Sequence, residues 1–435
     1  MCNNQPAKKK RVLIISELFY PMNVIGAVRP TKLAKLLAAN GYQVDVFTTP
    51  RTVSIKQELE RENYNLVSGI EDMEASEEEQ GTSVITKIAG RIKKRGKTLS
   101  ELAMTRRQLL YIKAGKAFCR SFVEAVNTGR VDLTQYDCVF STFGPVGSLL
   151  VGRKAKKLRP QLRWICDFRD PMLSQAMPKS LAWYYGYLQK KSIRLADSVT
   201  TVSNGYRKRI MPAKYLEKCT VIPNGYDPED QKHFEQVLTN GRFSFAYVGA
   251  LYEGKRDLGC LFKAIRWAVD EGMVSTDHLQ FHYAGREGAC LRQQAASYDL
   301  ESIITDHGQI GHDECLRLQA SVRFLVMSTW NDKGEEGVFP GKLIEYMLMK
   351  KPVINIVGGK LPNCEVTGVI RALELGISCE EADQQTYEQL KQWLAAQCGA
   401  YQTGWDAIFT PKTENIDARY NWENIVKRFG ELIEG

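Results

Sequence analysis

A loop followed by a helix near the end of the chain combines residue types that can bind an anion and a sugar. The segment 334–346 lies between two apolar runs, 324–327 and 352–357, which are typical of buried strands. Such a strand–loop–helix–strand unit builds parallel sheets, whose ligands bind where the helices begin. The helix N-terminus offers N–H groups to an anion, and Glu345 inside the helix could bind sugar hydroxyls. The alternative is an ordinary surface loop before an amphipathic helix.

A second candidate site is the glycine-bracketed loop 249–256, which follows another apolar run. Lys255 and Arg256 close this loop, and cations beside the free N–H groups of a helix are what a diphosphate requires. The alternative is a solvated Lys-Arg pair. Glu335 and Glu336 have two interpretations as well, a contact to a donor sugar or solvated side chains in their loop.

Charged residues also follow the buried strand predicted at 164–168. Asp167 lies near the end of that strand, and Arg169, Asp170 and Pro171 come directly after it. Charges at the carboxyl end of a parallel strand are typical of the edge that binds ligands. This interpretation is favoured over a structural ion pair that closes the end of the strand.

The positive charge of the chain is concentrated in one stretch. Residues 87–120 contain eleven basic residues and one acid, Glu101, so this stretch carries a net charge of +10 in a chain of +9. An anionic membrane surface is the favoured partner, because each Lys or Arg near an anionic leaflet contributes about 1 kcal/mol. A solvated face comes second. A nucleic-acid surface comes last, because aromatic residues and a reader motif are missing.

Composition places the 435-residue chain among soluble globular proteins, with 44% hydrophobic and 25% charged residues. No apolar run approaches the roughly 20 residues that span a bilayer. The eleven cysteines form no Cys-x-x-Cys pair, which indicates reduced thiols and a cytoplasmic location. The sequence shows no P-loop, catalytic triad or metal-ligand spacing.

The order of strands, glycine loops and helices predicts an α/β chain with two doubly wound, Rossmann-like domains that face a central cleft. The first domain is 1–225, with a basic insertion at about 51–115. The second is 226–414, and its first residues, about 226–240, are the linker between the domains. A C-terminal helix at about 415–435 is expected to cross back to the first domain.

The opening of the chain follows the same pattern. A first strand at 11–16 is followed by a loop at 17–30, with a glycine turn at Gly26, and by a helix at 31–39. A glycine just after the first strand lets a ligand approach the backbone. The stretch has no G-x-G-x-x-G, so a nicotinamide cofactor lacks its fingerprint.

Taken in order, these motifs resemble the family-4 retaining glycosyltransferases of the GT-B fold, bacterial polysaccharide-synthesis enzymes above all. The resemblance covers nearly the whole chain, and 51–115 matches least. The motifs that carry it are the loop 21–26, Asp167-Phe168-Arg169-Asp170-Pro171, Ile222-Pro223-Asn224-Gly225, the loop 249–256 and the segment 337–345.

The resemblance implies roles for individual residues. Lys255 matches a lysine that contacts the donor diphosphate, Glu345 a glutamate that binds the ribose, and Gly26 a loop glycine near the diphosphate and the acceptor. Two positions depart from the family pattern, because Gly337 stands where the first glutamate of E-x7-E is usual and Ala250 stands for an arginine. The donor-binding set expected from the resemblance is Gly26, Gly249, Lys255, Arg256, Glu335, Glu336, Phe339, Pro340, Lys342 and Glu345.

The implied reaction transfers a sugar, with retention and without a metal or cofactor, from a nucleotide diphosphate sugar to a saccharide acceptor. Arg169, Asp170 and Asp167 are the expected catalytic residues near the reacting sugar. A lipid-linked acceptor and peripheral attachment to the inner face of the membrane through 87–120 are expected. Two alternatives stay open, a non-catalytic nucleotide-sugar-binding or assembly subunit and a GT-B nucleotide-sugar epimerase.

Overall fold

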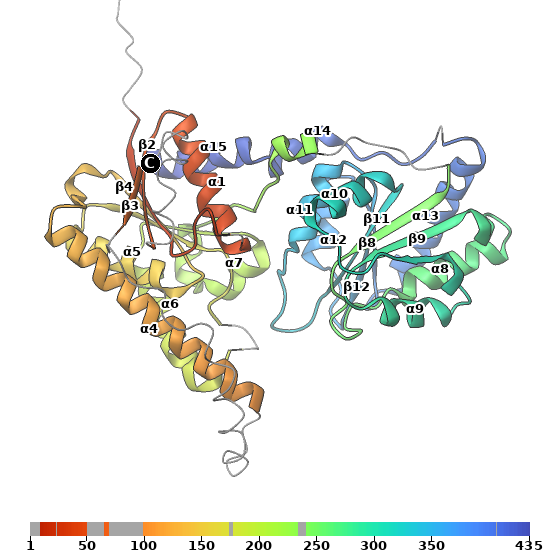
Figure 1. Ribbon diagram of the computed structural model, residues 1–435, viewed down its shortest axis with the longest axis horizontal. Coiled ribbons are helices and arrows are strands. Elements are labelled where there is room, and N and C mark those ends of the chain that lie inside the picture. The colour runs from red at the N-terminus through yellow and green to blue at the C-terminus, as the bar shows by residue number, and fades with distance from the viewer. Residues whose placement is uncertain are drawn as a thin grey trace, which may run out of the picture. The chain divides into compact units, whose positions relative to one another are not determined.

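The structure is a computed structural model that describes residues 9–22, 24–49, 65–68, 99–173, 177–233, 241–405 and 407–435. The chain divides into two compact units. In Figure 1 the first is coloured from red to yellow-green, together with the dark blue end of the chain, and the second from green to blue. Unit 1 comprises the chain up to Val202, Tyr206–Ile222 and Val426–Gly435. Unit 2 comprises Ser203–Gly205 and Pro223–Ile425.

Unit 1 is built on a parallel sheet that has seven strands within the described residues, in the order β3-β2-β1-β4-β5-β6-β7. The order reverses between β1 and β4, and ligands of such sheets bind outside the carboxyl ends of the strands at this reversal. The predicted α/β class is therefore confirmed for this unit. The strands are β1 Arg11–Ile15, β2 Gln43–Thr48, β3 Asn65–Ser68, β4 Cys138–Thr142, β5 Arg163–Phe168, β6 Ser198–Thr201 and β7 Cys219–Val221.

Helices cover both faces of this sheet, as in a doubly wound fold. One face packs against α4, α5 and α6 in a core that includes Val139 and Trp164. The other face carries Phe140, whose ring lies 5.6 Å from that of Phe429 in α15. The helices are α1 Ile25–Ala39, α4 Leu99–Asn127, α5 Val146–Leu158, α6 Lys179–Leu195, α7 Asn204–Ile210 and α15 Trp422–Glu434, with 3-10 turns at Leu133–Gln135 and Ala213–Lys218.

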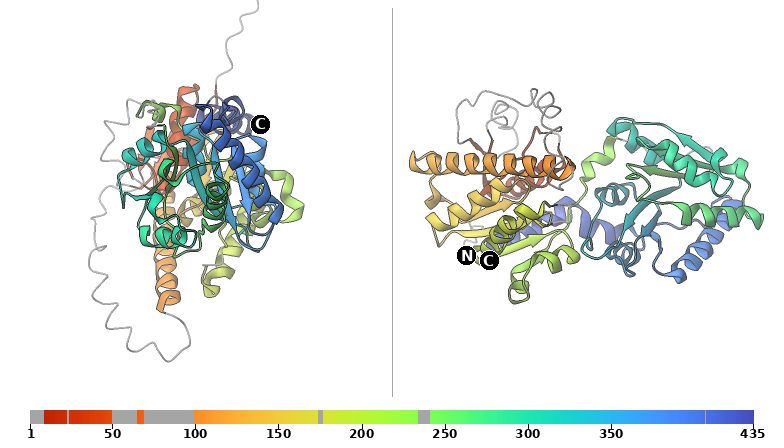
Figure 2. Two further views of the ribbon diagram at one scale, coloured as in Figure 1. Left: turned by 90° about the vertical axis from the view of Figure 1, so that its right-hand side faces the viewer. Right: turned by 90° about the horizontal axis from the view of Figure 1, so that it is seen from below.

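The helix α4 is the longest of the described helices, and its first part extends beyond the sheet (Figures 1 and 2). Gly115 lets it pack closely on α5, since a Cβ atom at Gly115 would lie only 2.8 Å from the backbone nitrogen of Gly147. Within the predicted insertion at 51–115, the structure describes the edge strand β3 and the start of α4, whereas most of the residues from 50 to 98 lie outside the described part.

The prediction of a loop from residue 17 to residue 30 was wrong in its second half. The helix α1 begins at Ile25, so Gly26 lies in its first turn and Pro30 lies inside it. Proline suggested a helix start at residue 31 because its ring usually interrupts a helix. Here Pro30 is only the sixth helical residue and is buried, so tertiary packing outweighs the missing backbone hydrogen bond.

Unit 2 repeats the plan with a parallel sheet that has six strands within the described residues, in the order β10-β9-β8-β11-β12-β13. The strands are β8 Phe243–Val248, β9 Leu279–Ala284, β10 Ile304–Asp306, β11 Phe324–Trp330, β12 Val353–Gly358 and β13 Gly376–Glu380. The helices are α8 Gly259–Asp270, α9 Gly288–Ala296, α10 His312–Ser321, α11 Gly341–Met349, α12 Glu365–Ala372, α13 Gln384–Gln402 and α14 Thr413–Tyr420, with 3-10 turns at Pro228–His233, Thr276–His278 and Glu301–Ile303.

The strand–loop–helix–strand unit predicted around 334–346 is confirmed as β11, α11 and β12. β11 and β12 pair in parallel, from Leu325 opposite Val353 to Trp330 opposite Gly358. The buried Tyr346 of α11 donates a hydrogen bond to the carbonyl oxygen of Val326 at 3.0 Å, which holds the helix on the sheet. The first turn of α11 therefore has a fixed place at the carboxyl edge.

Candidate functional site

A pocket of about 320 Å³ lies at the carboxyl edge of the unit 2 sheet, where β8 and β11 end and α11 begins. Five of the residues expected to bind the donor line this pocket, although they come from two loops far apart in the sequence. They are Gly249, Arg256, Pro340, Lys342 and Glu345. Tyr247, Tyr252 and Tyr346 are further lining residues, so the pocket combines charge with aromatic surface.

The start of α11 supplies the polar end of this pocket. Pro340 precedes the first helical residue, Gly341, and the N–H groups of the first turn give this end a partial positive charge. Glu345 lies one turn further on and accepts hydrogen bonds from Lys342 at 2.8 Å and from Gln319 at 3.2 Å. These two donors orient a carboxylate that is still about a quarter exposed, with 27% of its side chain accessible.

The side chains of Lys255 and Arg256, although adjacent in the sequence, contact different groups. The Arg256 side chain lines the pocket and donates to the carbonyl oxygen of Ala250 at 3.2 Å. Lys255 forms an ion pair with Glu335 at 3.1 Å and lies over the ring of Trp330, 4.2 Å from its centre. Lys255 and Glu335 are thus brought together, but beside the lining of the pocket and not in it.

Glu336 and Phe339 make contacts that hold their loop in place. The Glu336 carboxylate accepts a hydrogen bond from the backbone of Gly334 at 2.7 Å. The Phe339 ring stacks on Tyr420, with ring centres 5.8 Å apart and planes 13° apart. Gly337 has a φ of 82°, which favours glycine, so the residue that replaces the usual glutamate is also a turn residue.

Glu287 organises the basic loop, and the sequence analysis did not identify it. Its carboxylate accepts hydrogen bonds from the backbone N–H groups of Leu251, Tyr252 and Glu253, at 2.5, 3.2 and 2.7 Å. The N–H of Glu253 is the largest of the influences that lower the pKa of this carboxyl. Charged residues after the strand at 279–284 were the available signal, but only the fold brings residue 287 to residue 251.

In unit 1, Asp167 is completely buried at the end of β5. It accepts a bidentate pair of hydrogen bonds from the buried Arg29, at 3.0 and 3.1 Å. The hydroxyl groups of Thr142 and Thr200 donate to the same carboxylate at 2.8 and 2.7 Å. A carboxylate held in this way positions the ends of β4, β5 and β6, and its predicted catalytic role stays a prediction.

Arg169 and Asp170 lie at the surface of the same edge. They form an ion pair at 2.8 Å, and 51% of the Asp170 side chain is accessible. A Cβ atom at Gly26 would lie 3.1 Å from a guanidinium nitrogen of Arg169, and one at Gly144 would lie 3.0 Å from another. The structure therefore brings two residues predicted from distant motifs, Gly26 and Arg169, to one point.

Glu17 is a further titratable group at this edge that the sequence analysis missed. It is buried just after β1 and accepts a hydrogen bond from the backbone of Ser148 at 3.2 Å, while the Ser148 hydroxyl accepts one from the Glu17 backbone at 2.9 Å. Burial raises its pKa to about 7, and the N–H groups of Gly147 and Ser148 oppose this rise. The first turn of α5 is thus tied to β1 through one carboxyl group.

The described residues contain no group of three or more His, Cys, Asp or Glu side chains arranged to hold a metal ion. None of their helices combines the length and apolar character that crossing a bilayer requires.

Comparison with known proteins identifies the first half of the chain. Residues 26–225 match the model of a family described as "Glycosyl transferase 4-like domain". No curated protein sequence matches the chain. Residues 26–225 are thus similar to a glycosyl transferase 4-like domain, in agreement with the resemblance seen in the motifs of the chain.

Solved structures extend the likeness to the full chain. A sucrose-phosphate synthase (tll1590) from Thermosynechococcus elongatus is 16% identical, with 98% of each chain covered and a TM-score of 0.56. A glycosyltransferase from Rickettsia africae ESF-5 is 14% identical, with 98% of each chain covered and a TM-score of 0.53. The lipopolysaccharide outer core galactosyltransferase WaaB in its apo form is 14% identical, with 98% of this chain and 99% of that chain covered and a TM-score of 0.52. At this identity the likeness shows the fold, which is GT-B.

Proposed function

We propose that this chain, whose residues 26–225 are similar to a glycosyl transferase 4-like domain, is a retaining glycosyltransferase that acts in the synthesis of a cell-surface polysaccharide. It moves a sugar from a nucleotide diphosphate sugar to a saccharide acceptor. The observation that carries the proposal is the pocket at the start of α11, because residues predicted from two distant loops meet there.

The donor binds in this pocket through its ribose and its diphosphate. Glu345 has a fixed, partly accessible carboxylate, which can accept hydrogen bonds from ribose hydroxyls. Arg256 and the N-terminus of α11 supply positive charge to the same pocket, and Lys342 lies beside Glu345 as its hydrogen-bond donor at 2.8 Å. The pocket therefore suits a ligand that carries both hydroxyls and anionic charge.

The same charges assist departure of the diphosphate. The bond from the anomeric carbon to the diphosphate oxygen breaks and the diphosphate keeps the electron pair. The oxygen of an acceptor hydroxyl forms the new bond to the anomeric carbon, and its proton passes to the departing diphosphate oxygen. Fixed cations and a helix N-terminus stabilise the charge that develops on the leaving oxygen. The chain uses these groups in place of a metal ion or a cofactor. Lys255 joins them after leaving its surface ion pair with Glu335, which costs at most about 1 kcal/mol.

The acceptor approaches unit 1 at its carboxyl edge. Half of the Asp170 side chain is accessible there, Arg169 is paired with it and is 15% accessible, and Gly26 leaves room beside the guanidinium group. We assign Arg169 and Asp170 to the reacting sugar. Asp167 acts through Arg29, as a positioning residue beneath them.

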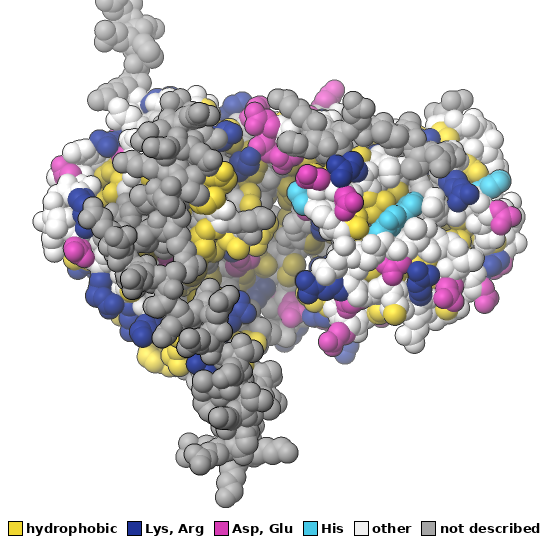
Figure 3. Space-filling view, in the orientation of Figure 1, with side chains coloured by type: hydrophobic (Ala, Val, Ile, Leu, Met, Phe, Trp, Pro, Cys, Tyr) yellow, Lys and Arg dark blue, Asp and Glu magenta, His cyan; other side chains and the backbone are white. Residues whose placement is uncertain are grey.

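A lipid-linked acceptor fits the surface of α4. Arg106, Arg107 and Lys113 are exposed on this helix together with Leu109 and Leu110, whose accessible fractions are 51% and 57%. Figure 3 shows Lys and Arg side chains close to hydrophobic ones on the lower part of unit 1. Exposed leucines beside cations suit the interface of an anionic bilayer. The protein would lie on the inner face of the membrane as a peripheral protein, helped by 87–98, which lie outside the described residues.

A non-catalytic nucleotide-sugar-binding subunit is the second candidate function. The observation that favours it is Gly337, a turn residue with no side chain in place of the glutamate usual in similar proteins. Such a subunit would bind the donor and transfer nothing.

A thermal-shift screen against nucleoside diphosphates and their sugars tests the donor pocket. A ligand at 100 times its dissociation constant adds about 2.7 kcal/mol to stability, which such a screen detects. We expect one nucleotide to stabilise the wild type and Glu388→Gln but not Glu345→Gln. Glu388 is the matched control, because it forms a similar i,i+3 pair with Lys391 on α13, outside the pocket. Equal stabilisation of Glu345→Gln, or no stabilisation by any nucleotide, would contradict the proposal.

A further inference from the structure

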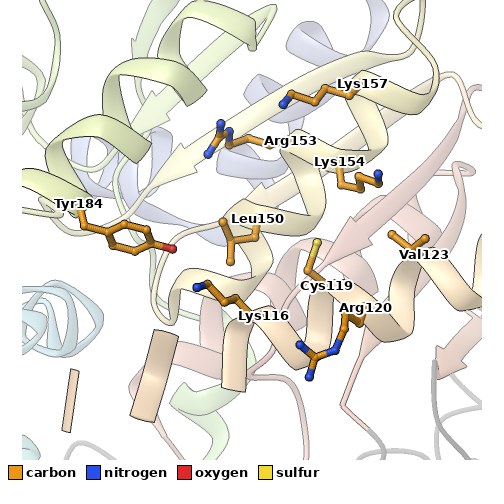
Figure 4. Close-up of a pocket in the computed structure, with 9 residues that line it drawn as sticks. All are labelled: Lys116, Cys119, Arg120, Val123, Leu150, Arg153, Lys154, Lys157 and Tyr184. Atoms are coloured by element: carbon orange, nitrogen blue, oxygen red, sulfur yellow. The ribbon is translucent and has the colours of Figure 1, made fainter. Parts of the chain in front are cut away.

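Unit 1 contains a groove of about 540 Å³ on the outer side of α4 and α5. In Figure 4, side chains from both helices surround the groove, and the Tyr184 ring reaches toward Leu150 from α6. The groove belongs neither to the donor pocket nor to the edge around Arg169. The lining residues are Lys116, Cys119, Arg120, Val123, Leu150, Arg153, Lys154, Lys157 and Tyr184.

The charges around this groove all have one sign. Five of its nine lining residues are Lys or Arg and none is acidic. None of the five cations forms an ion pair with a residue that the structure describes. The buried Nε of Arg153 also has no hydrogen-bond partner among these residues. Unpaired cations around one hollow repel each other, and an anion in the hollow removes this repulsion.

The charges converge on the floor of the groove. Burial raises the pKa of the Cys119 thiol, and the charges of Lys154, Arg153 and Arg120 oppose this rise. Cys119, Val123 and Leu150 are half-buried and provide an apolar surface beneath the cations. The groove therefore suits an anion that carries an apolar chain, more than it suits a free inorganic ion.

The number of cations indicates the kind of anion. A phosphodiester headgroup carries a single negative charge, whereas a diphosphate carries about two or more. Five cations around one groove leave a large positive excess over a phosphodiester and a much smaller one over a diphosphate. Charge complementarity therefore favours the diphosphate.

The position of the groove suits the acceptor side of the reaction. α5 begins with Val146 at the carboxyl edge of the sheet, and Leu150 follows four residues later, about 6 Å along the helix axis. On α4, Lys116 comes six residues after the exposed Leu110, about 9 Å along that helix. Trp183, next to Tyr184, is 72% exposed. A chain held in the groove can thus leave over exposed apolar side chains while a sugar on the diphosphate extends toward the edge.

We propose that this groove binds the diphosphate of a membrane-anchored lipid, the lipid that carries the acceptor saccharide. The acceptor part of this inference rests on the proposed function, whereas the groove itself is a binding site with or without it. Lys154 and Lys157 are its diagnostic residues, because they lie on α5 and outside the basic stretch 87–120.

Farnesyl diphosphate, a soluble amphiphile with this headgroup, is the probe, and calorimetry on the full chain is the measurement. We expect one site per chain, with an affinity at least tenfold higher than that for inorganic diphosphate or for farnesol. The double variant Lys154→Gln/Lys157→Gln should bind farnesyl diphosphate at least tenfold more weakly. The control Lys190→Gln/Lys208→Gln removes the same charge from exposed positions of α6 and α7, and it should bind like the wild type.

Two results would overturn the inference. One is equal affinity of the groove variant and the wild type for farnesyl diphosphate. The other is inorganic diphosphate binding as tightly as farnesyl diphosphate, which would make the groove a site for a free anion. A failure of the proposed function gives a different result. Nucleotide binding in unit 2, which is tested with Glu345→Gln, would then be absent, and this measurement does not involve the groove.

Discussion

The buried pair of Asp167 and Arg29 allows stability to be separated from activity at one edge of unit 1. Asp167→Asn keeps the size of the side chain and removes its charge. The guanidinium group of Arg29, which is 1% exposed, then loses the charge of its bidentate partner. Arg29 also donates to the carbonyl oxygen of Ile222 at 3.0 Å and lies 5.1 Å from the ring of Phe429, and neither of these groups carries a full negative charge.

The expected cost follows from this geometry. Removing one partner of a buried ion pair destabilises a protein by about 3–5 kcal/mol, because the other charge stays buried and uncompensated. The pair of Arg169 with Asp170 leaves 51% of the Asp170 side chain accessible, and ion pairs that water reaches in this way contribute about 1 kcal/mol or less. Asp170→Asn is therefore the matched comparison, three residues along the chain.

Amide hydrogen exchange of β5 and β6 is the assay. At 1.4 kcal/mol per tenfold change, 3 kcal/mol corresponds to about a hundredfold loss of protection in these strands. We expect this loss in Asp167→Asn and less than a tenfold loss in Asp170→Asn, with transferase activity abolished only in the latter when both are compared as folded protein. Full protection of β5 in Asp167→Asn would refute the positioning role of Asp167.

Three further predictions concern single residues. Burial raises the pKa of Glu17 from 4.5 to about 7, so both states are protonated below pH 4.5 and only the unfolded state ionises as the pH rises. The free energy of unfolding of unit 1 should therefore fall by about 3 kcal/mol between pH 4.5 and pH 7. Chemical denaturation of Glu17→Gln should show no such fall. Lys255→Ala should weaken nucleoside diphosphate binding by about tenfold in calorimetry, since a charge-assisted hydrogen bond contributes about 1.5–3 kcal/mol, and the exposed, ion-paired control Lys412→Ala should not; equal affinities would remove Lys255 from the diphosphate site. Gly26→Val should displace the Leu18 and Arg169 side chains, whose nearest atoms would lie 2.6 and 3.1 Å from the added Cβ atom, and lower kcat/KM for the acceptor by about tenfold or more, with nucleotide affinity unchanged; unaltered kinetics would separate Gly26 from the site.

Much of the fold could be predicted because its signals are local. Apolar runs such as 324–327 and 243–248 become buried central strands, and the glycine that follows each run marks a turn at the carboxyl edge. The start of α1 was misplaced for a local reason as well. Pro30 suggested a break, and the packing that tolerates it comes from residues distant in the sequence.

The candidate site was predictable only in part. Lys342 and Glu345 lie in one helix, so their proximity follows from helical spacing. Glu287 and Glu17 accept hydrogen bonds from backbone N–H groups 34 to 131 residues away, and no spacing in the sequence indicates such contacts. For Asp167, the sequence shows a charged residue at the end of a strand but does not show that this charge is buried against Arg29.

The most direct test of the account is transfer itself. Purified protein is incubated with the nucleotide sugar whose nucleotide stabilises it and with a bacterial lipid extract, and the release of nucleoside diphosphate is followed together with the glycosylated product. The account predicts equal amounts of both, dependence on the lipid extract, retention of the anomeric configuration, and loss of both in Glu345→Gln but not in Glu388→Gln. Nucleotide binding without any product would contradict it in favour of a binding subunit, and an isomerised nucleotide sugar would contradict it in favour of an epimerase.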